Sequence, residues 1–344
     1  MSIYKYRYCQ FNEIDKFKNF INSYWKKGHI LSQSDELIHF QHDVPGENYL
    51  SIVVAENQET GEFDGVLGYI NNWKFAPSHC IPKTLWGAVW KVRDDVSNKE
   101  IGSLGMGLLR FIFKNDTPEI WSSLGISDKH KDIAKSMNYC VGDINRYYIP
   151  NKTVDNFRVI KSPDINNLSN EVTDCYVKEI DFPYGYAPSL NMNPYKNIEY
   201  FENRYKNHIS FTYRYLGLFN KGELKGLFVF RNVDSAGPRV LRIMDFIGDL
   251  TEIHNVNVSV QELLRSESAE YIDCLNHGID SRFFLQLGFK QALKGGETIL
   301  PEYFDPFDQR YVPMEYAYIS DDDNPLVIFK ADGDQDRPNS INKI

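Results

Sequence analysis

One order of secondary-structure elements occurs twice along the chain, and this repeat constrains the fold more than any other feature. Each half is expected to form a helix, an antiparallel hairpin, a third strand, a second helix, a fourth strand and a third helix. In the first half these segments are 10–25, 50–55, 65–70, 84–92, 108–113, 121–126 and 129–137. In the second half they are 197–208, 213–219, 224–230, 240–246, 260–265, 271–275 and 281–287. The predicted class is α/β (α+β), with two mixed, largely antiparallel sheets flanked by helices.

Two local sequence matches support the repeat. The hairpin turn Gly61-Glu62-Phe63-Asp64-Gly65 corresponds to residues 222–226, and the helix end Ser136-Met137-Asn138-Tyr139 corresponds to residues 286–289. Matches at similar offsets are typical of an internal duplication.

A chain of 344 residues is long enough for two domains. We place them at 1–155 and 156–344, with the linker inside 150–162 and a strand at 145–149 that closes the first domain. The tail, 332–339, is polar and is expected to be a solvated end.

Composition limits the partners. The chain carries 38 Lys and Arg residues against 47 Asp and Glu residues, which gives a formal net charge of -9. We therefore expect no broad cationic surface of the kind that nucleic acid or an anionic membrane requires. A small phosphorylated ligand needs only a few local donors and is compatible with this charge. No apolar run reaches about 18 residues, so no membrane-spanning helix is expected.

The cysteines and histidines indicate neither a disulfide framework nor a metal site. Five cysteines are scattered without a CxxC spacing, and the N-terminus lacks the apolar core of a signal peptide. We therefore expect a protein of the reducing cytoplasm. His39 and His42 have a spacing that could place two ligands on one helical face, but Pro45-Gly46 favours a loop there, and we expect no metal.

A glycine-rich segment, Gly102-x-x-Gly105-x-Gly107, joins strand 84–92 to helix 108–113. Glycines let a ligand approach the backbone closely, and a helix N-terminus offers unpaired N–H groups and a positive dipole end. The segment is therefore a candidate pyrophosphate site. Two alternatives stay open. One is a simple turn, and the other is a dinucleotide site, although that motif has the spacing GxGxxG and an acidic residue after the next strand.

In this order of elements, the glycine segment resembles the phosphate loop of the GNAT acyl-CoA N-acyltransferases, which reads Arg/Gln-x-x-Gly-x-Gly/Ala. Gly105 and Gly107 match that pattern, whereas Gly102 stands where the family has Arg or Gln. The second half has no glycine loop after its third strand. The resemblance implies two GNAT-like domains, of which only the first binds acyl-CoA. The implied cofactor-binding residues are Val92, Arg93, Gly102, Ser103, Leu104, Gly105, Met106 and Gly107.

Two such halves in one chain resemble the nucleotide-sugar N-acyltransferases that act on dTDP-linked amino-dideoxyhexoses in the dTDP-anthrose and dTDP-3-amino-3,6-dideoxygalactose pathways. The segments that carry this resemblance are 25–31, 200–215, 301–307 and 333–339. It implies transfer of an acetyl or 3-hydroxybutyryl-type group from coenzyme A to a dTDP-linked 3- or 4-amino-dideoxyhexose, for O-antigen, capsule or surface-glycan synthesis. Acyl-CoA and the dTDP-amino sugar are the implied partners, without nucleic acid or membrane, and the oligomeric state stays open.

The implied reaction needs a neutral amine, donors for the oxyanion and a proton route to the departing thiolate. In the family the oxyanion donors are backbone N–H groups at a bulge in the third strand, which maps to residues 91–95. The acidic residues nearest that point make Asp94 and Glu100 catalytic candidates, and His29 is a second candidate base. The alternatives are a solvated turn for the acids and a histidine packed on Trp25.

The family's thiol-acid tyrosine is missing from both halves, because Ala134 and Phe284 stand at the corresponding positions. The CoA sulfur itself could then accept the proton of the amine. For this reason the residues leave the identity of the base open.

The second half is expected to contribute to a sugar-nucleotide cleft. The candidate substrate-binding residues are Trp25, Asp95, His208, Arg242 and Asp245.

Two other functions remain. A FemABX-like aminoacyl transferase would use aminoacyl-tRNA, which the net charge of -9 disfavours. A non-catalytic CoA-binding module is disfavoured by the intact Gly105-x-Gly107 at the start of a helix.

Overall fold

The computed structural model describes residues 2–79, 81–166, 168–188, 192–234, 237–304, 306–321 and 324–339. The chain divides into two compact units. The first unit comprises Met1–Cys140, Ala317–Asp321 and Gly333–Ile344, and the second comprises Val141–Tyr316 and Asp322–Asp332. The division falls after Cys140 instead of at the expected 155/156, and two C-terminal segments return to the first unit.

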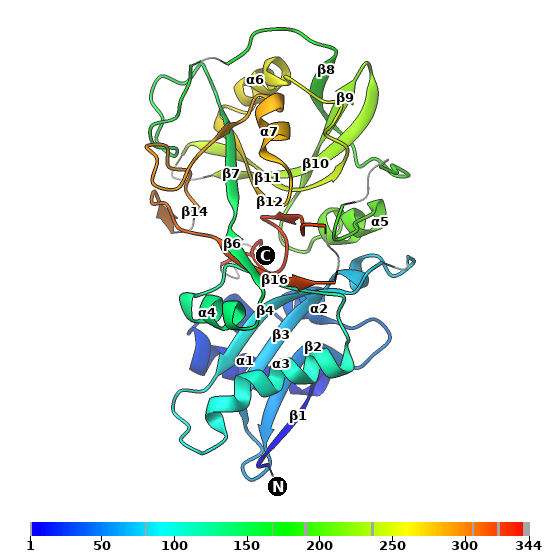
Figure 1. Ribbon diagram of the computed structural model, residues 1–344, viewed down its shortest axis with the longest axis vertical. Coiled ribbons are helices and arrows are strands. Elements are labelled where there is room, and N and C mark those ends of the chain that lie inside the picture. The colour runs from blue at the N-terminus through cyan, green and yellow to red at the C-terminus, as the bar shows by residue number, and fades with distance from the viewer. Residues whose placement is uncertain are drawn as a thin grey trace. The chain divides into compact units, whose positions relative to one another are not determined.

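The first unit is built on a seven-stranded sheet in the order β1-β2-β3-β4-β5-β16-β6 (Figure 1), and the unit division passes through β6 after Cys140 and through β16 before Ala317. Its strands are β1 (Tyr4–Gln10), β2 (Tyr49–Asn57), β3 (Phe63–Asn71), β4 (Thr84–Val92), β5 (Ile120–Leu124), β6 (Cys140–Asp143) and β16 (Glu315–Ser320). Its helices are α1 (Ile14–Phe20), α2 (Asp35–His42), α3 (Leu104–Asn115) and α4 (Asp128–Ser136). Strands β1 to β4 are antiparallel neighbours, whereas β4 and β5 run parallel. Helix α3 forms the crossover that a parallel pair requires.

Different helices cover the two faces of this sheet. Adjacent residues of β2 show this, since successive side chains of a strand point to opposite faces. Val54 packs in one apolar cluster with Phe17 of α1 and Leu37 of α2. Its neighbour Val53 packs in another with Leu104 and Leu108 of α3. Strand β2 is therefore buried on both faces, which explains its continuous apolar run.

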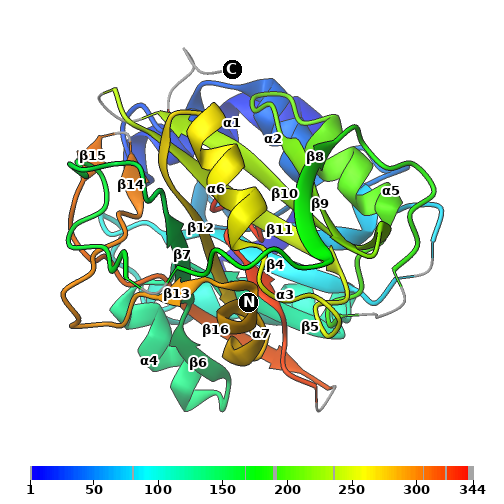
Figure 2. The ribbon, with the colours of Figure 1, turned by 90° about the horizontal axis from the view of Figure 1, so that it is seen from above.

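The second unit repeats this plan in an eight-strand sheet whose main path is β13-β7-β12-β11-β10-β9-β8 (Figure 2). The strands are β7 (Asn145–Pro150), β8 (Cys175–Ile180), β9 (Arg214–Asn220), β10 (Glu223–Asp234), β11 (Arg239–Gly248), β12 (Ala269–His277), β13 (Lys290–Gln291) and, paired with β12, β17 (Ile328–Phe329). The helices are α5 (Ile198–Phe201), α6 (Asn257–Ser266) and α7 (Ser281–Leu287), and β14 (Tyr303–Phe304) and β15 (Phe307–Asp308) form a separate hairpin. Antiparallel strands again lead to one parallel pair, β11 and β12, joined by a helix, α6. The predicted fold class and repeat are confirmed.

Each half of the sequence gives one strand to the other sheet. The strand expected to close the first domain is present as β7, but it lies in the second sheet, where it pairs with β12 and β13. In return β16, from near the C-terminus, lies between β5 and β6 in the first sheet. This exchange is why the units divide before residue 145.

The sequence analysis missed several elements of the described structure, among them β1, β6, β8, α2 and the C-terminal strands β13 to β17. β1 and β8 were not predicted, although each forms one edge of its sheet. The residues around His39 and His42 were expected to form a loop, but they lie in α2. His39 Nδ1 is 2.7 Å from Asp43 Oδ1, and His42 is fully buried, with Nδ1 3.0 Å from the carbonyl oxygen of Tyr69. No helix within the described ranges is both long and apolar enough to cross a membrane.

The polar tail is not a solvated end, and that expectation is wrong. Asp334 and Asp336 are 5% and 3% exposed. Gln335 Nε2 donates a hydrogen bond of 2.9 Å to the carbonyl oxygen of Leu124 at the end of β5. The tail is therefore part of the first unit, beside the end of its parallel strand pair.

A buried charge cluster lies inside the second unit. Lys196 Nζ is 2.8 Å from both Asp245 Oδ2 and Asp332 Oδ1, and Tyr205 Oη donates a hydrogen bond to Asp245. Asp245 and Asp332 are fully buried, so one ammonium group faces two carboxyl groups away from water. Burial raises the pKa of Asp332 to about 6, with Lys196 opposing and Asp245 reinforcing the shift.

We expect this cluster to make the second unit more stable in acid. A carboxyl group whose pKa is higher in the folded than in the unfolded chain holds its proton more tightly when folded, so stability falls as pH rises from about 4 to about 6. A difference of about 2 pKa units corresponds to about 2–3 kcal/mol. Relative to Asp332→Asn, the wild type should lose this amount of unfolding free energy between pH 4 and pH 7 in urea titrations. A difference between the two proteins that does not change with pH would contradict the assignment.

Candidate active site

A groove opens in the first unit where its two parallel strands separate. β4 and β5 pair from Thr84↔Ile120 to Gly87↔Ser123. β4 then continues to Val92, whereas β5 ends at Leu124. A strand edge that leaves its neighbour presents backbone N–H and C=O groups with which an extended ligand can pair.

Two adjoining cavities lie along this groove and share Trp90, Lys91, Ser127 and His130. The loop cavity, of about 490 Å³, is further lined by Val92, Arg93, Asp94, Ile101, Gly102, Gly105, Met106, Lys129 and Ile133. The apex cavity, of about 360 Å³, is further lined by Trp25, Leu67, Gly87, Ala88, Trp121, Ser123, Leu124, Gly125 and Ile126. Five of the eight predicted cofactor-binding residues therefore line the loop cavity.

The glycine segment forms one 3-10 turn, Ile101–Ser103, and then the start of α3. A Cβ atom on Gly102 would meet nothing within 4 Å, and one on Gly105 would lie 3.2 Å from Trp90 Nε1. The first turn of α3 contains no acidic residue. The cavity wall at this point is bare backbone at the positive end of a helix, which suits a phosphate group.

The other three residues of the predicted loop serve the fold. Leu104 is fully buried in the core, and Ser103 Oγ donates a hydrogen bond to the carbonyl oxygen of Glu100. A Cβ on Gly107 would collide with the ring and hydroxyl of Tyr6. Gly107 is thus a glycine because α3 packs closely on β1, and not because a ligand approaches it.

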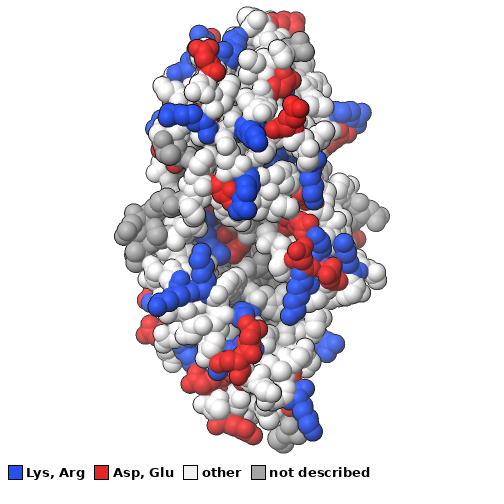
Figure 3. Space-filling view, turned by 90° about the vertical axis from the view of Figure 1, so that its left-hand side faces the viewer, with Lys and Arg blue, Asp and Glu red and all other residues white. Residues whose placement is uncertain are grey.

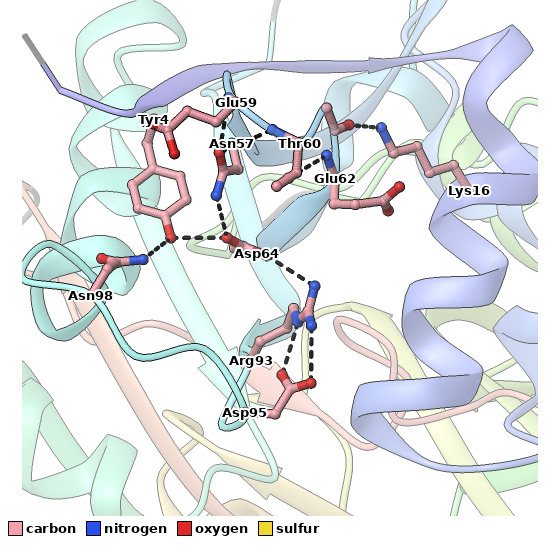
Figure 4. Close-up of polar contacts among 11 residues, drawn as sticks. Tyr4, Lys16, Asn57, Glu59, Thr60, Glu62, Asp64, Arg93, Asp95 and Asn98 are labelled. Atoms are coloured by element: carbon pink, nitrogen blue, oxygen red, sulfur yellow. Dashed lines mark hydrogen bonds and ion pairs between the residues drawn. The ribbon is translucent and has the colours of Figure 1, made fainter.

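Arg93 is held at the loop cavity by two carboxylates (Figure 4). Its Nη1 lies 3.1 Å from Asp64 Oδ1, and its Nε lies 2.9 Å from Asp95 Oδ1. Asp64 is buried and also accepts hydrogen bonds from Tyr4 and Asn57. The hydrogen bonds from Arg93 lower the pKa of Asp95. Asp95, a predicted substrate residue, instead fixes the orientation of Arg93.

Further cations line the loop cavity. Lys91 forms an ion pair with Asp94, whose side chain is 87% exposed. Lys129, in the first turn of α4, has no ion pair within the part of the chain that the structure describes. Lys129 therefore brings uncompensated positive charge to the cavity that contains Gly102, as a diphosphate requires. The sequence analysis missed Lys129 because an exposed lysine in a helix is normally only solvated.

The irregularity in β4 lies earlier than predicted. Its pairing with β3 shifts between Val89↔Gly68 and Gly87↔Tyr69, which leaves Ala88 as the extra residue. The predicted position at 91–95 is therefore wrong. Asp94 lies six residues further on, in the bend that follows the end of β4 at Val92, where it lines the loop cavity. Asp94 is therefore not next to the irregularity in β4, and its role as a base was inferred from that expected proximity.

His29 has a structural environment. Its ring stacks on Trp25 with centroids 5.7 Å apart, Nδ1 lies 3.2 Å from Leu31 N, and Nε2 lies 3.2 Å from Arg337 Nη2. Burial lowers the pKa of His29 to about 3, and the charges of Arg337 and Lys26 add to this effect. A ring with so low a pKa is a poor base at neutral pH. Trp25, predicted to bind substrate, lines the apex cavity.

Glu100 is also tied to the fold. Its carboxylate accepts hydrogen bonds from Ser2 Oγ and from the backbone N–H of Ile3. It therefore anchors the chain just before β1, and it does not line either of the two cavities.

The predicted substrate residues of the second unit are mostly structural. Arg242 is 2% exposed and forms an ion pair of 2.7 Å with Asp273, and it also donates to the carbonyl oxygen of Pro301. Asp245 belongs to the Lys196 cluster. A buried charge requires such partners, so the polar atoms of both side chains are already paired within the fold. His208 Nδ1 accepts hydrogen bonds from the backbone N–H groups of residues 210 and 211.

In the second unit, the chain itself fills the corresponding groove. β11 and β12 are paired from Arg239↔Ala269 to Ile243↔Cys274. Beyond that point β17 pairs with the end of β12, and Ala331 N donates a hydrogen bond of 3.1 Å to the carbonyl oxygen of Met244 in β11. The segment from Ile328 to Ala331 thus pairs with both β11 and β12 at the point where these strands separate.

The sequence analysis did not identify two polar residues of the first groove. His130 lies edge-on to Trp90 with centroids 5.1 Å apart, and burial lowers its pKa. Ser123 is 3% exposed and lines the apex cavity. Neither His130 nor Ser123 belongs to a recognisable sequence motif. They line the groove only because β4 and β5 diverge. Among the described residues, no group of three or more His, Cys, Asp or Glu side chains could hold a metal ion.

Comparisons with known proteins support the fold. No family model matches the sequence, and no curated protein matches it. A GCN5-related N-acetyltransferase from Anabaena variabilis ATCC 29413 is similar in structure, with a TM-score of 0.52 and 9% identity over 92% of this chain and 72% of that chain. A conserved protein of unknown function from Enterococcus faecalis V583, named a probable N-acyltransferase, has a TM-score of 0.50 and 8% identity over the same shares. The chain has the fold of the GCN5-related N-acetyltransferases.

The glycine wall of the loop cavity can be tested by changing its charge. Gly102 has open space around it, so a side chain there should enter the cavity without disturbing the fold. We expect Gly102→Asp to weaken binding of coenzyme A at least 10-fold by repelling its phosphates, and Gly102→Arg to strengthen it. Gly102→Ala is the matched control for the loss of glycine. The measurement is a calorimetric titration, and equal affinities for the three variants would place the phosphates elsewhere.

Proposed function

We propose that the protein is an acyl-CoA-dependent N-acyltransferase that binds coenzyme A along the groove between β4 and β5. The observation that carries this proposal is the open groove itself, with Gly102 and Gly105 at the start of α3 and the cations Arg93 and Lys129 on the same cavity. The diphosphate would lie in the loop cavity. The pantetheine arm would follow the free edge of β4, and the thioester would reach the apex cavity.

Only the first unit is assigned to coenzyme A. In the second unit the corresponding groove is occupied by β17 and the residues that follow it, and no glycine-rich turn opens α6. The Lys196 cluster fixes Asp332 at the end of that segment. We therefore assign to the second unit a supporting role.

The chemistry requires little from acidic or basic side chains. The amine nitrogen attacks the thioester carbon, the carbonyl electrons move to oxygen, and collapse of this intermediate forms the amide and expels the CoA thiolate. The proton lost by the amine ends on that thiolate. Backbone donors at the irregular residue Ala88 would stabilise the oxyanion, each by about 3 kcal/mol where such donors have been measured. Correct placement of the two reactants supplies about 7–11 kcal/mol more.

For the acceptor we propose a dTDP-linked 3- or 4-amino-dideoxyhexose, and for the acyl group acetyl or a 3-hydroxybutyryl type. Support comes from two of the sequence segments that resemble the sugar-nucleotide enzymes. Segment 25–31 begins with Trp25, which lines the apex cavity. Segment 333–339 contains Gln335, which binds the carbonyl oxygen of Leu124 at the same cavity. Both segments thus border the place where the acceptor amine must arrive.

A FemABX-like transfer from aminoacyl-tRNA fits the surface less well. Transfer RNA binding requires a broad basic face, and Figure 3 shows acidic and basic side chains interspersed over the face it presents. A CoA-binding module without catalysis would bind coenzyme A but would not release thiol from acyl-CoA.

A thiol-release assay tests the proposed function. Acetyl-CoA and 3-hydroxybutyryl-CoA should each be combined with dTDP-3-amino- and dTDP-4-amino-dideoxyhexoses, with the free amino sugars as matched controls. We expect thiol release with at least one nucleotide-linked acceptor and little with the free sugars. Release that is equal for free and linked sugars would contradict the nucleotide part of the proposal. Binding of acyl-CoA without release would favour the non-catalytic module.

Asp94 provides a test of where the phosphates lie. Its carboxylate lines the loop cavity and neutralises Lys91. Asp94→Asn should therefore lower KM for acyl-CoA several-fold, because Lys91 becomes available to a phosphate, while kcat stays within about threefold. A fall of kcat by about 10²–10⁴-fold would instead identify Asp94 as a general base, and initial-rate kinetics distinguish the two results.

A further inference from the structure

One buried hydroxyl group lies at the apex of the groove without a partner. Ser123 is the last residue of β5 that pairs with β4, and it is 3% exposed. Its Oγ makes no hydrogen bond within the part of the chain that the structure describes, and the residue lines the apex cavity. Buried hydroxyl groups are nearly always hydrogen-bonded, so this donor is suited to a group that enters the cavity.

The neighbouring strand leaves room for this hydroxyl. Gly87 is the residue opposite Ser123, and a Cβ atom on Gly87 would lie 2.6 Å from Ser123 Oγ. Any other residue at Gly87 would therefore displace the hydroxyl. The next residue, Ala88, is the extra residue of the β4 irregularity. The hydroxyl thus lies beside the point where backbone donors for an oxyanion are expected.

We propose that Ser123 is a catalytic residue whose hydroxyl donates a hydrogen bond to the carbonyl oxygen of the acyl thioester, and more strongly to the oxyanion formed from it. This inference rests on the proposed acyl transfer. The hydroxyl keeps its proton throughout. The C–N bond forms, the C–S bond breaks, and the amine proton passes to the CoA thiolate as in the scheme above. Because a serine hydroxyl offers one donor, Ser123 acts by stabilising the transition state and not as an acid or base.

The chain contains a matched control. Ser122 is also fully buried and its Oγ also lacks a partner in the described structure. Successive residues of a strand face opposite sides of the sheet, and Ser122 does not line the apex cavity. Ser122→Ala and Ser123→Ala therefore remove the same group from adjacent positions, and neither change breaks a hydrogen bond, so both variants should unfold at the wild-type temperature.

Two measurements test the inference. With the amino-sugar acceptor, Ser123→Ala should lower kcat about 10²-fold without changing KM for acyl-CoA, and Ser122→Ala should match the wild type. Without any acceptor, the carbonyl stretch of bound ¹³C-labelled acetyl-CoA should lie at lower frequency in the wild type and in Ser122→Ala than in Ser123→Ala. An unchanged band and an unchanged kcat in Ser123→Ala would overturn the role of Ser123 and leave the proposed function intact. If the wild type bound no acetyl-CoA, the proposed function and this inference would both fail.

Discussion

The chemistry proposed for the first unit depends on how briefly β4 and β5 run together. They share four paired positions, and β4 then continues past Trp90 to Val92, still paired with β3 but no longer with β5. This separation produces the groove, exposes a free strand edge, and brings the start of α3 and the first turn of α4 to the same cavity. Had β5 continued alongside β4, the same residues would have formed a closed sheet with no space for a ligand. The glycines and cations matter only because the strands diverge.

The second unit shows the same geometry with the opening filled. There the residues from Ile328 to Asp332 bind to both separating strands, and Asp332 is held by Lys196 in a cluster removed from water. Ion pairs of this kind contribute little net stability, but losing one partner leaves an uncompensated charge at high cost. The cluster therefore specifies the position of the segment more than it strengthens the fold. One repeated architecture thus leaves its groove open in the first unit and fills it in the second.

Local sequence patterns predicted most elements but not their partners. The bounds of β4 and α7 were predicted to the residue, because an apolar run and a capped amphipathic turn are local properties. The exchange of β7 and β16 was not predictable, since each strand pairs with residues far away in the sequence and no local signal marks the choice of sheet. In the site, Gly102 and Gly105 were identified from the glycine spacing. Ser123 and Lys129 were missed, and the burial and ion pairs of Arg242 and Asp245 were not foreseen, because burial and ion pairing appear only in three dimensions.

The exchange of strands has a consequence for biosynthesis. β16 takes its place beside β5, yet it is synthesised some 190 residues later, a delay on the order of 10–40 s at the usual rate of translation. During that time the edge of β5 on the nascent chain is unprotected, and such edges recruit strands from other molecules. A second copy emerging from a neighbouring ribosome carries the same β16 segment and is an equally good donor. The first sheet therefore cannot be completed until β16 has been synthesised.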